Sequence, residues 1–219
     1  MSRTLIAGPY TFTGTDGTNV SADTTNWTEQ DGVSGQLRLK SNGFQQAFGA
    51  PSDDCWKGAG TFTGDQYFEV KLLGSWATSD QDGIGGTLRN DGTASTSHNC
   101  YRVFWQPSLN STAGAAQVYK VVAGTPTQIG ANINFGMTAS DLLSAEAVTN
   151  GANVDIIVYK NGVSQGTRSD TSSVLTGGKP GITGKGSSYV LIGDDWTAGN
   201  VTAAAAGGFL NRNFWWGNY

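Results

Sequence analysis

Charged residues are scarce in this sequence. Aspartate, glutamate, lysine and arginine make up 14% of the 219 residues and leave a formal net charge of −4, whereas about 25% is usual for a soluble protein. Nucleic-acid-binding domains have clustered basic residues, and long exposed helices have many charges of both signs. Neither class fits this composition, and we expect no nucleic-acid partner.

Long hydrophobic stretches are also missing. No run approaches the roughly 18 apolar residues of a membrane-spanning helix. The N-terminal residues MSRTLIAGPY lack the apolar core of a secretory signal peptide. We therefore expect no membrane partner and no export by the standard route, so the protein is expected to be made in the cytoplasm.

Side chains with reactive or metal-binding chemistry are few. His98 is the only histidine, which excludes a multi-histidine metal site, and its Ser- and Asn-rich surroundings predict an exposed loop. Cys55 and Cys100 are too few for a disulfide framework or a cysteine-based zinc site, and we favour two reduced, packed thiols over a bridge. The sequence motifs of serine hydrolases, P-loop proteins and zinc peptidases are absent.

Glycine and aromatic residues are abundant. The chain has 32 glycines, seven tryptophans, seven tyrosines and nine phenylalanines, which is typical of a turn-rich β protein whose rings supply the apolar bulk. Polar and apolar residues alternate, with the period of a β-strand, over 65–73, 83–89, 100–106, 116–122, 145–149, 153–160 and 188–193. Together with 36–40 and 44–48, these segments predict about ten strands in an antiparallel β-sandwich or jelly roll.

Two local patterns refine this prediction. Asn161-Gly162 between two strand-like segments predicts a type I′ hairpin. Residues 141–148 resemble a helix, but they are short and lead into a β-rich region, so we interpret them as a turn and a strand. No interior linker is visible, and we predict one domain over 1–198, followed by an Ala/Gly connector and an aromatic tail over 199–219.

An ordered series of motifs runs from about residue 12 to residue 196. It includes Trp27, the strand DQYFEVKLL, DGIGGTLR, YRVFW, KNGV, GKPGI and a closing DDW. The series resembles concanavalin A-like lectin/glucanase (laminin-G-type) jelly-roll domains, which are common in bacteriophage particle proteins and glycan-binding modules. The resemblance implies two stacked, curved sheets with a concave face that such proteins often use for carbohydrate.

Glycosidases of this fold typically have the pattern E-x-D-x-E on one strand, and this sequence lacks it. Its three glutamates are Glu29, Glu69 and Glu146. Glu69 and Glu146 on neighbouring strands could form a carboxylate pair, but ion pairing of Glu69 with nearby arginines is the favoured interpretation. Lyases of this fold need a Tyr/His pair beside a basic strand. Tyr101, Arg102 and His98 match that arrangement only faintly.

Calcium is a separate question, because the resemblance implies that relatives often bind it at the rim of the sandwich. The candidate clusters are Asp53 with Asp54, Asp80 with Asp82, and Asp194 with Asp195. None has EF-hand spacing, and aspartate is also a common turn residue. We therefore favour turns and expect no cofactor, with structural calcium as the alternative.

Carbohydrate binding would use aromatic rings and planar polar groups on an exposed face. In 65–73 we expect Phe68, Val70 and Leu72 to point inward and Tyr67, Glu69 and Lys71 to point outward. The predicted glycan-binding residues are Tyr67, Glu69, Arg89 and Arg102 on the outer face of one sheet, with Trp76 at the rim.

The C-terminal tail is rich in aromatic residues. After the connector AGNVTAAAAGG, the tail contains Phe209, Phe214, Trp215, Trp216 and Tyr219. An exposed set of this kind normally marks an interface, and we favour docking onto another subunit over a terminal strand that folds back into the sandwich.

These observations predict a non-enzymatic structural or binding module. The predicted setting is a bacteriophage virion, as a capsid decoration or fibre protein, with other virion subunits or copies of itself as partners and a host-surface glycan as ligand. The alternatives are a polysaccharide-degrading glycosidase or lyase of the same fold, and a free soluble lectin.

Overall fold

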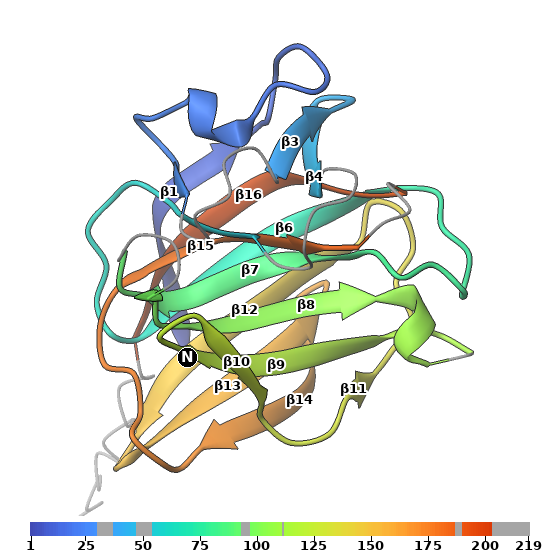
Figure 1. Ribbon diagram of the computed structural model, residues 1–219. Coiled ribbons are helices and arrows are strands. Elements are labelled where there is room, and N and C mark those ends of the chain that lie inside the picture. The colour runs from blue at the N-terminus through green and yellow to red at the C-terminus, as the bar shows by residue number, and fades with distance from the viewer. Residues whose placement is uncertain (30–36, 47–53, 93–96, 111, 187–189, 203–219) are drawn as a thin grey trace, which may run out of the picture.

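The computed structural model describes residues 1–29, 37–46, 54–92, 97–110, 112–186 and 190–202, with the side chains of 21, 29 and 54–57 outside the description. The protein is built from two antiparallel β-sheets that pack face to face (Figure 1). The predicted antiparallel β-sandwich is therefore confirmed. Among the described residues, no helix is both long and apolar enough to span a lipid bilayer.

Sheet A has the strand order β14-β13-β12-β6-β16-β4-β3, and β1 also pairs with β16. Its strands are β1 (Ser2–Tyr10), β3 (Leu37–Lys40), β4 (Gly43–Gln46), β6 (Gln66–Gly74), β12 (Leu142–Asn150), β13 (Asn153–Lys160), β14 (Val163–Asp170) and β16 (Leu191–Thr202). The first and last described strands thus lie side by side, with Ser2 opposite Thr202. Strand β16 includes residues 199–202, which the sequence placed in the connector.

Sheet B has the order β10-β9-β8-β7-β15-β5-β2, and β11 also pairs with β9. Its strands are β2 (Thr28–Glu29), β5 (Asp54–Lys57), β7 (Gly83–Asn90), β8 (Cys100–Gln106), β9 (Ala115–Val122), β10 (Thr125–Gln128), β11 (Ile133–Asn134) and β15 (Lys179–Lys185). The short 3-10 helices η1 (Val20–Ala22) and η3 (Pro107–Leu109) lie in connections between strands.

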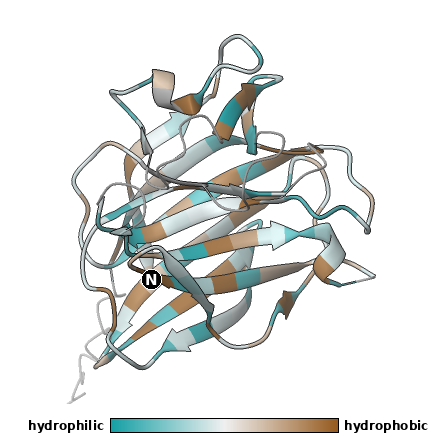
Figure 2. Ribbon diagram, in the orientation of Figure 1, coloured by the Kyte–Doolittle hydropathy of each residue, from teal (hydrophilic) through white to brown (hydrophobic). Residues whose placement is uncertain are grey.

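The hydrophobic core lies between the two sheets. Figure 2 shows hydrophobic and hydrophilic residues following one another along the strands, because successive side chains point to opposite faces. Phe68, Val70 and Leu72 of β6 point into the core and are fully buried, as predicted. On β8, Tyr101, Val103 and Trp105 form the core face. Burying each such side chain stabilises the fold by roughly 1.5–3 kcal/mol.

Both local predictions are confirmed. Strands β13 and β14 pair through a turn in which Asn161 and Gly162 have φ of 50° and 78°, the positive values that a type I′ turn requires. A turn at 139–140 leads through Asp141 into β12, which contains the rest of 141–148. Asp141 fixes this turn by accepting hydrogen bonds from the Thr138 backbone N–H at 2.6 Å and from Asn161 Nδ2 at 2.6 Å.

The prediction for His98 is wrong, because this residue is only 3% exposed. The turn between β9 and β10 packs against the segment that contains it. Gly124 N–H donates to the His98 carbonyl at 3.0 Å, and Ala123 N–H donates to Asn99 Oδ1 at 2.9 Å. Polar composition predicted a loop, but composition does not show what covers it.

Candidate functional site

The predicted glycan-binding residues do not share one face. Tyr67 and Glu69 lie on the outer face of sheet A, whereas Arg89 and Arg102 lie on β7 and β8 of sheet B. The prediction of a single face is wrong because β6 pairs with β12 and β16, while β7 belongs to the opposite sheet. Alternation along a strand shows which side chains point together, but it does not show which sheet the strand joins.

Arg89 is a buried structural residue with 2% exposure. Its Nε donates to the Gly64 carbonyl at 2.7 Å, its Nη1 to the Leu175 carbonyl at 2.6 Å, and its Nη2 to Asp65 Oδ1 at 3.0 Å. Burial lowers the pKa of the Arg89 guanidinium, and Asp65 acts in the opposite direction. Arg102 is also buried, with 3% exposure, so neither arginine presents its side chain to solvent.

Trp76 lies at the rim and stays partly exposed, as expected of a rim aromatic. Its ring packs edge-on against Trp105 with centroids 5.6 Å apart. It also lines a hollow of 270 Å³ together with Met137. Of the five predicted residues, Trp76 is thus the one whose aromatic ring remains available at the surface.

Tyr67 and Glu69 belong to a cluster centred on Arg3 of β1, a residue that the sequence gave no reason to consider. Arg3 Nε donates to Glu146 Oε1 at 2.6 Å, and its Nη1 lies 3.6 Å from Glu69 Oε2. The guanidinium carbon lies 4.8 Å from the ring centroid of Tyr67 and 4.9 Å from that of Tyr159. The predicted ion pairing of Glu69 is present, but its cation is Arg3 instead of the expected Arg89 or Arg102.

The Arg3 cluster indicates how this face of sheet A is shaped. β1 and β12 are separated by β16 and β6, a distance of about 14 Å in a flat sheet. Arg3 nevertheless contacts Glu146, so the outer face of sheet A is concave between β1 and β12. Gly199 of β16 lies between them beside Tyr67, and a side chain there would collide with the Thr4 carbonyl oxygen at 1.9 Å and with the Tyr67 ring at 2.8 Å.

Glu69 and Glu146 do share a face, as the glycosidase alternative requires, and they are diagonal neighbours in the pairing of β6 with β12. Both Glu146 carboxylate oxygens are engaged, because Tyr159 Oη donates to Oε2 at 2.8 Å while Arg3 holds Oε1. Burial and this hydrogen bond raise the pKa of Tyr159 to about 12, so it remains a donor at neutral pH. With 3% exposure, Glu146 offers no oxygen to a substrate.

The aspartates considered for calcium act in turns and ion pairs. Asp80 Oδ2 accepts from the Ala77 backbone N–H at 2.6 Å, Asp82 Oδ2 accepts from the Val190 N–H at 2.8 Å, and Asp195 pairs with Lys71 at 3.1 Å. In the part of the chain that the structure describes, no three metal-binding side chains come together. Asp53 and the side chain of Asp54 lie outside that part, as does the whole aromatic tail from Phe209 to Tyr219.

A second polar cluster lies at the edge of sheet B, where the sequence gave no prediction. It surrounds an open cleft of 660 Å³, which we call the carboxamide cleft. The cleft is lined by Leu109, Asn110, Gln128, Ala131, Asn132 and Asn134. The cleft is shallow and widely open to solvent.

The amides of the carboxamide cleft hold one another in place. Gln117 Nε2 donates to Gln128 Oε1 at 3.3 Å and to Asn132 Oδ1 at 3.1 Å, and Gln128 Nε2 donates to the same Asn132 oxygen at 3.0 Å. Asn132 Nδ2 and the whole Asn134 side-chain amide make no hydrogen bond with the described residues. These groups remain available for a ligand.

Arg168 of β14 fastens the loop that forms one wall of the cleft. Its Nε donates to the Ala131 carbonyl at 2.7 Å and its Nη2 to the Asn132 carbonyl at 3.0 Å. Gly130, at φ of 68°, lets the backbone approach this arginine, since a Cβ there would lie 2.7 Å from Arg168 Cδ. The cleft is therefore preorganised by a side chain from the opposite sheet.

An aromatic pair adjoins the cleft on the outer face of sheet B. Tyr119 stacks on Phe104 with ring centroids 5.8 Å apart and an interplanar angle of 12°. Tyr119 Oη donates to Gln117 Oε1 at 3.1 Å, and Tyr119 lies opposite Gln128 in the pairing of β9 with β10. Tyr119 is partly exposed, whereas Phe104 is buried beneath it.

The outer face of sheet B lacks carboxylates over its described side chains. The register shows which residues point outward from β7, β8, β9, β10 and β15. They are Gly83, Gly85, Thr87, Cys100, Arg102, Phe104, Gln106, Ala115, Gln117, Tyr119, Val121, Pro126, Gln128, Gly181, Thr183 and Lys185. Glycoside hydrolysis canonically uses two carboxyl groups, and none is among these outward-pointing side chains.

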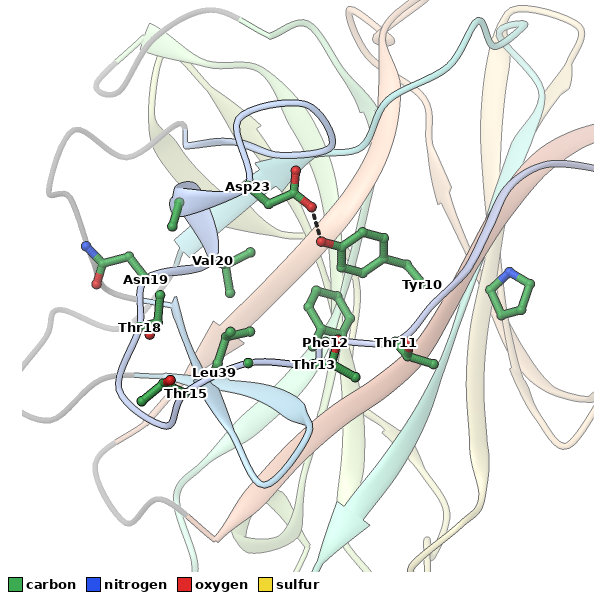
Figure 3. Close-up of a pocket in the computed structure, with 13 residues that line it drawn as sticks. Tyr10, Thr11, Phe12, Thr13, Thr15, Thr18, Asn19, Val20, Asp23 and Leu39 are labelled. Carbon is green, nitrogen blue, oxygen red and sulfur yellow. Dashed lines mark hydrogen bonds between the residues drawn. The ribbon is translucent and has the colours of Figure 1, made fainter.

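A third site, the N-terminal hollow, lies where β1 leads into η1 (Figure 3). It is lined by residues 9–15, 18–20, 22, 23 and Leu39, and its volume is 810 Å³. The hydroxyl of Tyr10 donates a hydrogen bond to the Asp23 carboxylate at one wall. Burial raises the pKa of Tyr10 to about 12, and the hydrogen bond to Asp23 acts in the same direction.

No family model matches the sequence, and no curated protein matches it. Solved structures do match. The carbohydrate binding module CBM66 from Bacillus subtilis is 15% identical, with a TM-score of 0.55 over 80% of this chain and 96% of that chain. A legume lectin-like domain from Entamoeba histolytica is 11% identical, with a TM-score of 0.52 over 90% and 99%.

A β-glucanase from Bacillus licheniformis is 13% identical, with a TM-score of 0.51 over 82% of this chain and 94% of that chain. Similarity at these identities shows the fold alone. The fold is a concanavalin A-like jelly roll, as the sequence resemblance implied.

Proposed function

We propose that this protein is a carbohydrate-binding module without catalytic activity and that the carboxamide cleft is its binding site. The observation on which this rests is the preorganised set of amides around that cleft. Each carboxamide has both a donor and an acceptor, which suits the hydroxyl groups of a sugar. Partly exposed Tyr119 beside the cleft offers an aromatic surface for the apolar face of the sugar ring.

The surroundings of the cleft support binding over cleavage. Glycoside hydrolysis canonically uses two carboxyl groups that flank the bond, and the described outer face of sheet B has none. The competing function, a glycosidase that uses Glu69 and Glu146, would need substrate to reach Glu146, which is 3% exposed. A carbohydrate binding module and a lectin-like domain among the similar structures are in line with the proposal. A β-glucanase is also among them, so the chemistry of the carboxamide cleft carries the proposal.

A titration with neutral oligosaccharides tests this proposal. The panel contains gluco-, manno-, galacto-, xylo- and fructo-oligosaccharides, and the heat of binding is measured for the wild type, Asn132→Ala and Gln128→Ala. Losing one or two hydrogen bonds should weaken binding roughly tenfold. Gln165→Ala is the matched control, since Gln165 is an amide on β14 whose Nε2 donates to the Val163 carbonyl of its own strand.

The same panel tests the enzymatic alternative. Wild-type protein should release no reducing sugar and no unsaturated product from the corresponding polysaccharides. Product release that Glu69→Gln abolishes would overturn the proposal in favour of a glycosidase.

We further propose that the module works on a larger assembly, for which the sequence resemblance favours a bacteriophage particle. In this proposal the aromatic residues of the tail dock onto another subunit, and the cleft faces outward toward a host-surface glycan. Five aromatic residues over 209–219 support it.

A further inference from the structure

The N-terminal hollow differs in chemistry from the carboxamide cleft. Tyr10 and Asp23 form one wall, and Leu39 of β3 lies across from them (Figure 3). The rings of Phe12 and Trp27 pack against Tyr10 with centroids 4.7 and 5.2 Å away. The hollow is therefore fixed to the core at its base and open above.

The charge in this hollow is not neutralised. The Asp23 carboxylate is held by neutral donors, namely Tyr10 Oη, Asn26 Nδ2 at 2.9 Å and the Asn26 N–H at 3.2 Å. These hydrogen bonds, that of Asn26 first, lower the pKa of Asp23, so it is ionised at neutral pH. No lysine, arginine or histidine is among the lining residues.

Several charged residues lie next to the hollow without lining it, among them Arg38 and Lys40, which flank Leu39 on β3. Lys40 follows the lining residue Leu39, but it is paired with Asp16 at 2.8 Å. Asp194 adds a second negative charge close by, since its Oδ1 lies 3.5 Å from the Phe12 N–H. Among the lining residues themselves, the one charged side chain is the negative Asp23.

The remaining walls are hydroxylated. Thr11, Thr13 and Thr15 line the hollow, are exposed, and make no side-chain hydrogen bond with the described residues. Their hydroxyls can both donate and accept. A ligand that matches this hollow combines a cation with several hydroxyl groups and fits within 810 Å³.

We infer that the N-terminal hollow is a second binding site, independent of the carboxamide cleft, and that it takes the protonated amine of an amino sugar. The ammonium group would lie against the Asp23 carboxylate and the ring of Tyr10, because both attract a cation. The sugar hydroxyls would face Thr11, Thr13 and Thr15. The uncharged carboxamide cleft provides no such carboxylate.

A pair of matched sugars tests this inference. Binding of a glucosamine tetramer and of its N-acetylated form is measured by titration calorimetry at pH 6, where primary amines are protonated. The free amine should bind at least about tenfold more tightly, since one charge-assisted hydrogen bond contributes that much. Equal affinity for the two tetramers would overturn the inference.

Variants locate the effect. Asp23→Asn keeps the shape and one acceptor, and it should remove the preference for the free amine. Asp16→Asn, a change at an exposed aspartate that already has its own lysine, should keep the preference.

If Asp23→Asn fails to fold, Tyr10→Phe serves instead. This variant leaves the carboxylate in place and should still prefer the free amine, and loss of the preference would contradict the assignment.

Two further measurements separate this site from others. Asn132→Ala should leave the amino-sugar preference unchanged, so failure of the carboxamide cleft and failure of this inference are distinguishable.

Trilysine is the second probe. Trilysine binding as tight as that of the glucosamine tetramer would show recognition of the ammonium group alone and would overturn the assignment to an amino sugar.

Discussion

Arg3 Nε lies 2.6 Å from Glu146 Oε1, although the two residues are 143 positions apart in the chain. The contact crosses the outer face of sheet A, from β1 to the buried Glu146 of β12. One hydrogen bond therefore ties β1 to β12 within sheet A and occupies one oxygen of the Glu146 carboxylate.

Replacing Arg3 should destabilise the fold. Arg3→Ala leaves the Glu146 charge buried with Tyr159 as its remaining donor, so the free energy of unfolding should fall by about 2 kcal/mol. Partial exposure of Arg3, 26% for its side chain, keeps the loss below that of a fully buried pair. Urea unfolding followed by tryptophan fluorescence measures it.

The control for this prediction is Lys40→Ala. This change breaks a pair in which both side chains are more than 40% exposed, and it should leave the free energy of unfolding nearly unchanged. If the two variants lose equal stability, the special role given to the Arg3 contact is wrong.

Arg168 should act on binding through the position of the loop. Arg168→Lys keeps the charge but loses the planar group that reaches the Ala131 and Asn132 carbonyls together. Affinity for a neutral oligosaccharide should drop roughly fivefold, while the free energy of unfolding changes by about 1 kcal/mol or less. Unchanged affinity would mean that the loop does not need this anchor. The measurements are titration calorimetry and urea unfolding on the same preparation.

Acid should remove a stabilising contribution from Asp141. Burial alone would raise the pKa of this residue, but hydrogen bonds from Asn161, Thr138 and Lys160 lower it from 3.8 to about 2. Because the folded state favours the ionised form, the contribution is complete above pH 4 and is lost as the pH falls toward 2.

The variant Asp141→Asn checks this pH dependence. It should lower the free energy of unfolding by about 1–2 kcal/mol at pH 6, and the difference from the wild type should shrink between pH 4 and pH 2. Denaturant unfolding at several pH values provides the data. A difference that stays constant with pH would show that the ionised carboxylate is not the cause.

Removing the aromatic tail tests the proposed docking. Strand β16 already pairs with β1 and ends at Thr202, so deletion of residues 207–219 should leave a folded domain with unchanged glycan binding. Light scattering should show that self-association or incorporation into particles is lost. Unchanged assembly would refute docking, whereas collapse of the circular dichroism signal would favour a tail that completes the sandwich.

The sequence predicted the parts of the fold in which one side of a strand is buried. Phe68, Val70 and Leu72 alternate with polar residues because sheet A has one solvent-facing side. Strand β1 gave no such signal, since it lies mostly exposed with Leu5 and Ile6 on its surface. Which strands become neighbours depends on contacts across the whole chain, so the sheet of Arg89 could not be predicted.

The candidate sites were harder to predict for a chemical reason. Asparagine and glutamine are ordinary turn and surface residues, so Gln128, Asn132 and Asn134 carry no signal by themselves. They form a site because Gln117 and Arg168, distant in sequence, hold them around one cleft. Asp23 gave no signal in the sequence either, because its importance depends on the absence of a cationic side chain among the residues that line the N-terminal hollow.

The most direct test of the central claim is a nuclear magnetic resonance titration of the ¹⁵N-labelled protein with the best-binding neutral oligosaccharide. The side-chain amide signals of Gln128, Asn132 and Asn134 should shift together and saturably, with the sugar intact at the end of the experiment. Shifts confined to the outer face of sheet A around Glu69, or conversion of the sugar during the titration, would contradict the account.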